Sequence, residues 1–391
     1  MKRKFAILVV GVALVGFELL AQLHSGFPVD ITSGPIPQPV MANNRTYLLY
    51  ELHVTNFAPL PIEITRLEIL GDSTTSFASY SGGTLEDMVL PVERLSSPES
   101  PSEYVGSRIL GEGHSAVVFV DLTLNHEMPL PRQLNHRFTF SITPKGKQTV
   151  ERTLTGPAVP VSAAQTAVLD APLHGSGWVA FNALGGKDHR RSLNAVDGKE
   201  RIPQRFAIDW MRLGPDGRLF HGTDQSNANF YGYGAEVLAV GDGRVSDVKD
   251  GLPENNGTTE LSARSLTLDS VLGNYVMLDL GAGHFAAYAH LQPGSLKVKI
   301  GEHVKSGQVL GLLGNSGNSD APHLHFQLVD ANAPMASEGI PFELEAFTEI
   351  GFVRDDPAPQ NNGSILLPDS EHKPVIHTHE FPMNNAAMTF R

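Results

Sequence analysis

The chain has 391 residues, with 42 acidic and 29 basic side chains and a formal net charge of −13 at pH 7. An acidic chain repels phosphate backbones, so nucleic acid is not an expected partner. The absence of cysteine excludes disulfides, thiolate metal sites and a cysteine nucleophile. The 38 glycines and 27 prolines supply many turns, which favours a mainly β chain of short strands.

The first 24 residues have the pattern of an export signal. Three basic residues, Lys2, Arg3 and Lys4, precede an apolar run over residues 5–20. A membrane-spanning helix needs about 20 apolar residues, so the shorter run favours a signal peptide, with an uncleaved N-terminal anchor as the alternative. We therefore expect a periplasmic or secreted protein with no stable membrane span once the signal is removed.

Residues 43–156 have the pattern of an antiparallel β domain. Within residues 46–56, apolar side chains alternate with polar ones, which is typical of a half-buried strand. Similar stretches cover residues 62–70, 116–124 and 137–142, and turn-rich segments separate them. We interpret this domain as an accessory β-sandwich, immunoglobulin-like in type.

A connector over residues 157–177 leads to a second β domain, predicted over residues 178–350. An Asp-Gly turn predicts a hairpin within residues 234–245, and a Gly-Ala-Gly turn predicts another within residues 274–291. Residues 351–391 are polar and proline-rich. We expect them to form a tail on the surface, in which the second His-x-His sequence of the chain is solvated.

Four side chains of the second domain suggest a metal site. His323 and His325 share one face of a strand because side chains alternate along it. His290 ends the strand over residues 285–291, and Asp209 ends another strand. Catalytic zinc takes three protein ligands, histidine and carboxylate among them, and a further histidine can serve as acid or base. We predict that the four side chains converge on one groove.

These residues belong to a longer pattern that resembles the lysostaphin-type (LytM-like) zinc metallopeptidases over residues 205–330. Its most specific part is the run GNSGNSDAPHLHF, which follows a Tyr-x-His-Leu strand. The resemblance implies a LytM-like β-sheet domain that uses Zn²⁺ to hydrolyse peptide bonds in peptidoglycan. It also implies that Asp209 and His325 are zinc ligands and that His290 and His323 are the catalytic histidines.

Arg205 stands where the family has its first zinc ligand, a histidine four residues before the aspartate. An arginine stays protonated and cannot bind zinc. We expect Arg205 to share a strand face with Asp209, so that its charge competes with zinc unless the guanidinium swings away to solvent.

Three interpretations of this substitution remain open: an inactive domain, a weak site on two ligands, or replacement by another histidine. The candidates for replacement are His189 and His221. We favour His189 because the adjacent Asp188 can accept its second N–H and fix the tautomer.

The sequence therefore predicts an exported zinc metalloendopeptidase that cleaves peptidoglycan peptides. The alternative is a catalytically degenerate module that binds the cell wall or regulates another hydrolase. Retention of all four site residues favours the enzyme. The role of the first domain is left open, and a protein partner is one of its options.

Overall fold

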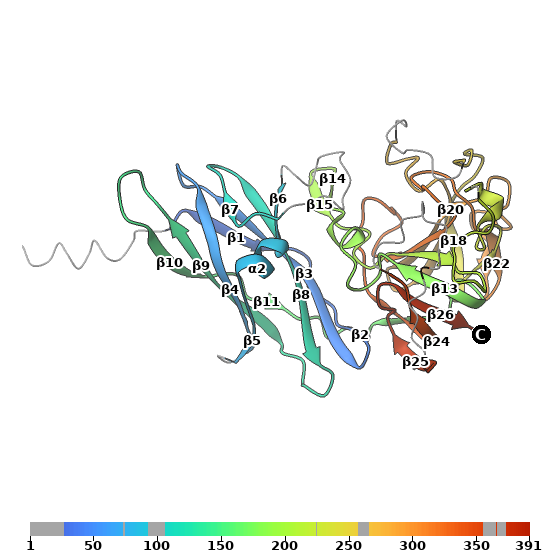
Figure 1. Ribbon diagram of the computed structural model, residues 1–391, viewed down its shortest axis with the longest axis horizontal. Helices are drawn as coiled ribbons and strands as arrows, with labels where there is room; N and C mark the ends of the chain where they lie inside the picture. The colour runs from blue at the N-terminus through green and yellow to red at the C-terminus, as the bar shows by residue number, and fades with distance from the viewer. Residues whose placement is uncertain are drawn as a thin grey trace, which may run out of the picture.

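The computed structural model describes residues 27–72, 75–92, 106–223, 225–256, 266–354, 365 and 373–391. The predicted signal peptide lies outside these residues. Across the part of the chain that is described, no helix is both long and apolar enough to cross a membrane. Strands dominate both ends of the molecule, as the composition predicts (Figure 1).

Two sheets form the N-terminal part of the molecule, which we call the N-terminal sandwich (residues 27–161 as described). The first sheet contains β1 (Val29–Ser33), β3 (Arg45–Asn56), β8 (Ser115–Asn125) and β6 (Val89–Pro91), with β2 (Val40–Ala42) paired to β3. The second contains β10 (Val150–Thr155), β9 (Gln133–Ile142), β4 (Ile62–Leu70) and β5 (Ser76–Ser81), with β11 (Val159–Pro160) on β9 and β7 (Ile109–Leu110) on β4. One short helix, α2 (Gly82–Met88), follows β5.

The alternation of β3 decides which of its faces is buried in the sandwich. Leu48, Tyr50 and Leu52 point into a core that both sheets share. Glu51 lies on the other face, opposite Phe119 of β8. The antiparallel sandwich expected from the sequence is thus present, and its immunoglobulin-like type stays a prediction.

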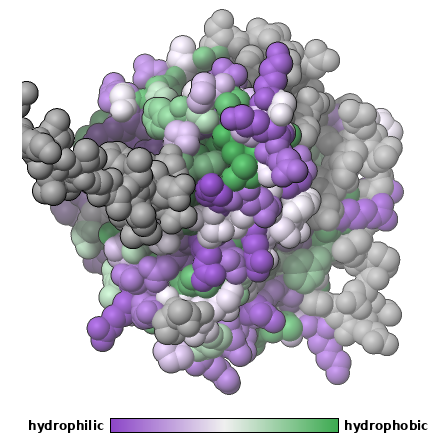
Figure 2. Space-filling model, turned by 90° about the vertical axis from the view of Figure 1, so that its left-hand side faces the viewer, coloured by the Kyte–Doolittle hydropathy of each residue, from purple (hydrophilic) through white to green (hydrophobic). Residues whose placement is uncertain are grey.

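Hydrophilic side chains cover much of the end of the molecule seen in Figure 2.

An eleven-stranded sheet organises the C-terminal part. Its order is β12 (Ala167–Leu169), β24 (Phe342–Phe352), β26 (Ala386–Phe390), β13 (Gly175–Phe181), β16 (Ile208–Arg212), β23 (Leu324–Val329), β20 (His284–Leu291), β19 (Asn274–Gly281), β18 (Gly243–Lys249) and β21 (His303–Val304), with β25 (Val375–Glu380) on β24. Two small sheets add β14 (Asn194–Val196) with β15 (Lys199–Arg201), and β17 (Glu236–Leu238) with β22 (Val309–Leu312). The 3₁₀ helices are η2 (His189–Arg191) and η3 (Asn227–Asn229).

The predicted hairpins have different outcomes. Strands β19 and β20 pair antiparallel, so the hairpin within residues 274–291 is confirmed. The hairpin within residues 234–245 is wrong, because β17 pairs with β22 while β18 pairs with β19 and β21. The Asp-Gly turn is local, whereas the partner of each strand is chosen by distant segments.

The prediction of a polar surface tail over residues 351–391 is wrong for its last part. Strand β26 lies inside the sheet, between β24 and β13. Its Met388 is fully buried, and the ring of Phe390 lies 5.3 Å from that of Trp210. His377, expected to be solvated, stacks on Phe347 and hydrogen-bonds to Glu380. Strand β26 is short, and its small alanines make its apolar face hard to recognise in the sequence, which explains the wrong prediction.

A buried ionic network joins the N-terminal sandwich to the C-terminal sheet, which lie side by side in Figure 1. Glu51, on the outer face of β3, is 2% exposed and accepts hydrogen bonds from Arg190 and Arg205. Arg205 also donates to Glu338, at 3.0 Å. Burial alone raises the pKa of Glu51, but the two guanidinium groups outweigh it and lower this pKa to about 2.

This depressed pKa predicts acid-sensitive stability. A group whose pKa is lower in the folded state stabilises the fold above its unfolded pKa, and the contribution disappears as pH falls toward the folded value. We expect the free energy of unfolding to lose about 3 kcal/mol from Glu51 between pH 5 and pH 2. Urea unfolding at several pH values measures this loss. It should vanish in Glu51→Gln but persist in Glu63→Gln, which removes a partly exposed partner of Arg108.

Candidate metal centre and active site

Asp209 and His325 face each other on adjacent strands. Strand β16 pairs with β23 so that Asp209 lies directly opposite His325. Residues paired in this way point to the same face of a sheet. Their side chains meet, with His325 Nδ1 2.8 Å from Asp209 Oδ1. The predicted juxtaposition follows from strand register and alternation.

His323 lies two residues before His325 and reaches the same carboxylate. Its Nε2 is 3.3 Å from Asp209 Oδ1. Its Nδ1–H donates to the carbonyl of Ala321 at 2.8 Å, which holds the ring in place. The His-x-His spacing thus brings both imidazoles to one carboxylate, as alternation predicts.

His290 reaches the site through an irregularity in β20. Ala289 is the residue opposite His325, and Tyr288 is opposite Phe326 in the core. Regular alternation would therefore point His290 into the core with Tyr288. A register shift at the end of β20 and a positive φ of 63° at His290 turn it the other way. Its ring centre lies 4.7 Å from that of His323 and 5.7 Å from that of His325.

His189 joins these residues from a loop 20 residues upstream of Asp209. It begins helix η2, and its Nε2 lies 3.2 Å from Asp209 Oδ2. The candidate donor atoms of His189, Asp209 and His325 all lie within 4.8 Å of one another. The expected role of Asp188 is wrong, because the carbonyl of Ala207 accepts the second N–H of His189 at 3.2 Å.

The other candidate, His221, lies away from this group. Its side chain is exposed and its ring packs against Tyr231 with centres 5.8 Å apart. Among the described residues, the set of His189, Asp209 and His325 is the group whose atoms lie close enough to hold one metal ion.

Arg205 does not share a strand face with Asp209, which corrects the sequence expectation. Strand β16 begins at Ile208, and Arg205 lies in the turn before it. Its guanidinium is buried and bonds to Glu51 and Glu338 instead of turning to solvent. The backbone of Gly339 approaches this turn so closely that a Cβ there would lie 2.5 Å from the carbonyl of Pro203. The arginine charge is thus neutralised away from the Asp209 carboxylate.

In each of the two candidate histidine ligands, one ring nitrogen has an outer hydrogen-bond partner and the other faces Asp209. Gln327 donates its amide to the carbonyl of Pro334, so its oxygen accepts from His325 Nε2–H at 2.9 Å. Likewise, His189 donates from Nδ1, to Ala207. The inner nitrogens, His325 Nδ1 and His189 Nε2, both contact the Asp209 carboxylate, where a metal ion would take the place of a shared proton. Three such donors converging in a buried site fit a cation, and histidine nitrogen with carboxylate oxygen suits zinc.

The negative charge of Asp209 favours the binding of a cation at this site. Burial raises the pKa of Asp209, but the charges and hydrogen bonds of His189 and His323 outweigh it and hold this pKa well below its usual range. Burial lowers the pKa values of His189 and His323, but Asp209 outweighs it and raises both. The carboxylate thus attracts protons or a metal ion to the same place.

The pKa of His290 responds differently. Burial lowers it well below its usual range, and the neighbouring His323 and His325 lower it further. Its Nδ1–H donates to the carbonyl of Ser316 at 2.7 Å. His290 is therefore neutral at pH 7, with Nε2 left to take a proton.

Two further residues of the site were not predicted. Asn182 donates to Asp209 Oδ2 at 2.9 Å from the end of β13, and no local pattern identifies it. Gln327 orients His325 as described above. Its position in the sequence His-x-His-x-Gln is a usable signal, because alternation puts all three side chains on one face.

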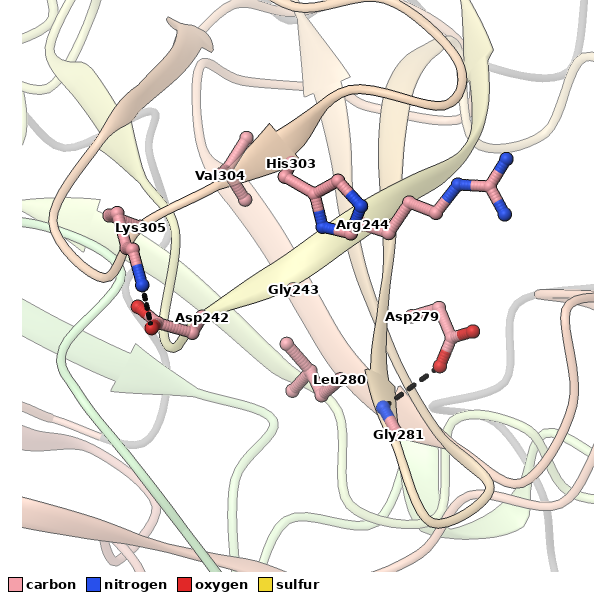
Figure 3. A pocket seen from close by; sticks show the side chains of 9 residues that line it. All are labelled: Asp242, Gly243, Arg244, Asp279, Leu280, Gly281, His303, Val304 and Lys305. Carbon is pink, nitrogen blue, oxygen red and sulfur yellow. Dashed lines mark hydrogen bonds and ion pairs between the residues drawn. The ribbon is translucent and has the colours of Figure 1, made fainter.

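A shallow pocket lies at the opposite end of β20 from His290. It has a volume of about 520 Å³ and is bordered by the ends of β18, β19 and β21 (Figure 3). Lys305 pairs with Asp242 at its rim, and both side chains are largely exposed. The three candidate metal ligands lie elsewhere, so this pocket contributes nothing to the metal centre.

Comparison with known proteins identifies the C-terminal part. Residues 227–337 match Peptidase family M23. This segment is an M23 peptidase domain. It contains His290, His323 and His325, whereas His189 and Asp209 lie upstream of the matched residues.

Two relatives with named activities are similar to part of the chain. The chain is 38% identical over 84 residues to the peptidoglycan DD-endopeptidase ShyA of Vibrio cholerae, covering 19% of each protein. It is 32% identical over 115 residues to the glycyl-glycine endopeptidase ALE-1 of Staphylococcus capitis, covering 29% of this chain and 26% of that one. The matched segment therefore spans only about a fifth to a quarter of these two relatives.

Two solved structures are also similar to part of the chain. The catalytic domain of the protein EnpA from Enterococcus faecalis is 22% identical, with 44% of this chain and 92% of that chain covered and a TM-score of 0.26. The catalytic domain of lysostaphin from Staphylococcus simulans is 21% identical, covering 42% of this chain and 85% of that one, with a TM-score of 0.22.

Proposed function

We propose that this protein is an exported zinc metalloendopeptidase that hydrolyses peptide bonds in bacterial peptidoglycan. The observation that carries the proposal is the set of three inward-facing donors, one each from His189, Asp209 and His325. Catalytic zinc sites use three protein ligands and keep a fourth position open. The M23 match, the relative named a peptidoglycan DD-endopeptidase and the relative named a glycyl-glycine endopeptidase support this substrate class.

The residues around the donors fit peptide hydrolysis. Zinc, when bound, supplies Lewis-acid chemistry: it polarises a carbonyl oxygen and makes water more acidic. His290, neutral and anchored at Nδ1, is placed to take a proton at Nε2. His323, whose pKa is raised, is placed to hold a proton at Nε2 and to stabilise negative charge on the scissile carbonyl oxygen.

We further propose that Asn182, Gln327 and the carbonyl of Ala207 orient the three ligands. Each occupies the outer hydrogen-bonding position of one ligand. Such partners fix the tautomer and direction of a ligand and strengthen its basicity.

The test is metal analysis combined with a cell-wall digestion assay. We expect about one zinc per chain, loss of activity with a chelator and its return when zinc is restored. Digestion of purified peptidoglycan should release new amino groups and no new reducing sugar ends, because a peptide bond and not a glycosidic bond is cut. A purified protein without bound zinc, or one that releases only reducing ends, would contradict the proposal and favour a non-catalytic or glycosidic role.

A further inference from the structure

The second part of the loop that carries His189 packs on the N-terminal sandwich. We call residues 182–204 the docking loop. Its Leu193 and Ile202 pack with Leu90, Val117 and Phe119 of the sandwich. Glu200, from β15, pairs with His53 of β3 at 3.1 Å. The docking loop is therefore shaped by a surface outside the M23 domain.

Consecutive side chains of helix η2 connect the metal centre with that surface. His189 points to Asp209, while Arg190, the next residue, points to the sandwich. The Arg190 guanidinium donates to Asp121 at 2.8 Å and to the carbonyl of Tyr50 at 3.0 Å. It also bonds to Glu51 and lies over the ring of Phe119, with its central carbon 5.1 Å from the ring centre.

These contacts are strong enough to fix the loop. Arg190 is 4% exposed and Glu51 is 2% exposed, so neither charge has water as an alternative partner. Breaking a buried ion pair by removing one partner is strongly destabilising because the other charge is left without compensation. A rigid Arg190 restricts His189, since the two residues share one turn of η2.

The same carboxylate also fixes the start of the aspartate strand. Glu51 binds Arg205, which lies four residues before Asp209. One acidic side chain of the sandwich thus connects the segments that carry two of the three candidate ligands.

We propose that the N-terminal sandwich positions a ligand of the metal centre. Glu51 and Asp121 of the sandwich bind Arg190, and this contact holds the neighbouring His189 in its ligand position. Arg190 is a positioning residue and not a ligand. This inference rests on the proposed function, because it presumes that His189, Asp209 and His325 bind zinc. It gives the sandwich a specific role, since undocking it would withdraw one ligand and weaken the metal site.

The experiment measures zinc affinity by competition with a chelating dye in the full chain. We expect Arg190→Ala to weaken zinc binding by about 10–100-fold, an effect similar to the loss of an outer hydrogen-bond partner, because His189 would no longer be held in place. Asp121→Asn removes one contact of a half-exposed carboxylate and should cause a smaller loss. Arg108→Ala, which breaks the ion pair with Glu63 elsewhere on the sandwich, should leave zinc affinity unchanged.

A double-mutant cycle separates positioning from general destabilisation. In a His189→Ala background, Arg190→Ala should cause almost no further loss of zinc affinity, because the ligand that it positions is gone. An equal loss in both backgrounds would overturn the inference. So would wild-type zinc affinity in Arg190→Ala. If Arg190→Ala does not fold, the same cycle is measured with Asp121→Asn in its place, and the same outcomes test the inference. Failure of the wild type to bind zinc, by contrast, would reject the metal centre itself.

Discussion

Replacing His189 by alanine is expected to remove zinc from the protein as severely as replacing His325. Each substitution leaves two protein donors where a catalytic zinc site has three. We expect zinc affinity to fall by more than the roughly 10–100-fold that follows loss of an outer hydrogen-bond partner. Hydrolysis of peptidoglycan should fall in parallel. Equilibrium dialysis with metal analysis measures the first effect, and release of amino groups from cell-wall material measures the second.

His221→Ala is the matched control for this result. His221 is exposed and packs on Tyr231, so its loss should change neither zinc content nor activity. Equal zinc stoichiometry and activity in the wild type and in His189→Ala would reject His189 as the third ligand. Arg205 offers no substitute, because its guanidinium is already bound by Glu51 and Glu338.

Replacing His290 by alanine should affect turnover and not metal binding, unlike the replacement of His189. We expect zinc to stay bound and the turnover rate to fall strongly. General acid–base catalysis typically contributes 10²–10⁴-fold, so kcat should fall by about this factor. The zinc content should match that of the wild type, because His290 lies outside the donor set of three. Metal analysis and turnover of the same preparation test both halves of the prediction.

His284→Ala controls for the loss of a histidine from the same strand. His284 begins β20 at the hairpin turn, while His290 lies near its other end. We expect normal turnover from this variant. If His290→Ala and His325→Ala lose zinc equally, the division of the histidines into ligands and proton carriers is wrong.

The combination of these variants also addresses the alternative of a degenerate domain. The family resemblance leaves Arg205 as a reason to expect an inactive site, since it replaces a ligand. In the structure, Arg205 is part of the contact with the sandwich, and His189 lies beside Asp209 as one of the three candidate donors. The variants at His189 and Arg190 test this pairing directly.

Local sequence patterns were enough to predict much of the site. The sequence predicts a strand at Asp209, although it places Asp209 at the end of that strand and the structure places it near the start of β16. His323 and His325 alternate at the start of β23, so their shared face follows from period two. The hairpin of β19 and β20 follows from its glycine turn. The specific GNSGNSDAPHLHF run indicated the M23 domain that the family comparison shows.

Other features depend on residues too far apart for any local pattern. Arg190 and Glu51 are 139 positions apart, and Arg205 and Glu51 are 154 positions apart. The burial of β26 depends on its insertion between two distant strands. The sequence favoured His189 over His221 because of Asp188, whereas in the structure the packing of the loop brings His189 to Asp209 and Ala207 accepts its other N–H.

The sequence by itself determined the residue types of the site and the strand faces of Asp209, His323 and His325, because alternation is a property of each strand alone. Tertiary structure decided the rest. Alternation alone would have pointed His290 into the core, and only the left-handed backbone at that residue turns it to the site. The third candidate donor, His189, lies in a loop that packs on the sandwich surface. Both depend on packing between segments distant in the chain, which composition and spacing do not encode.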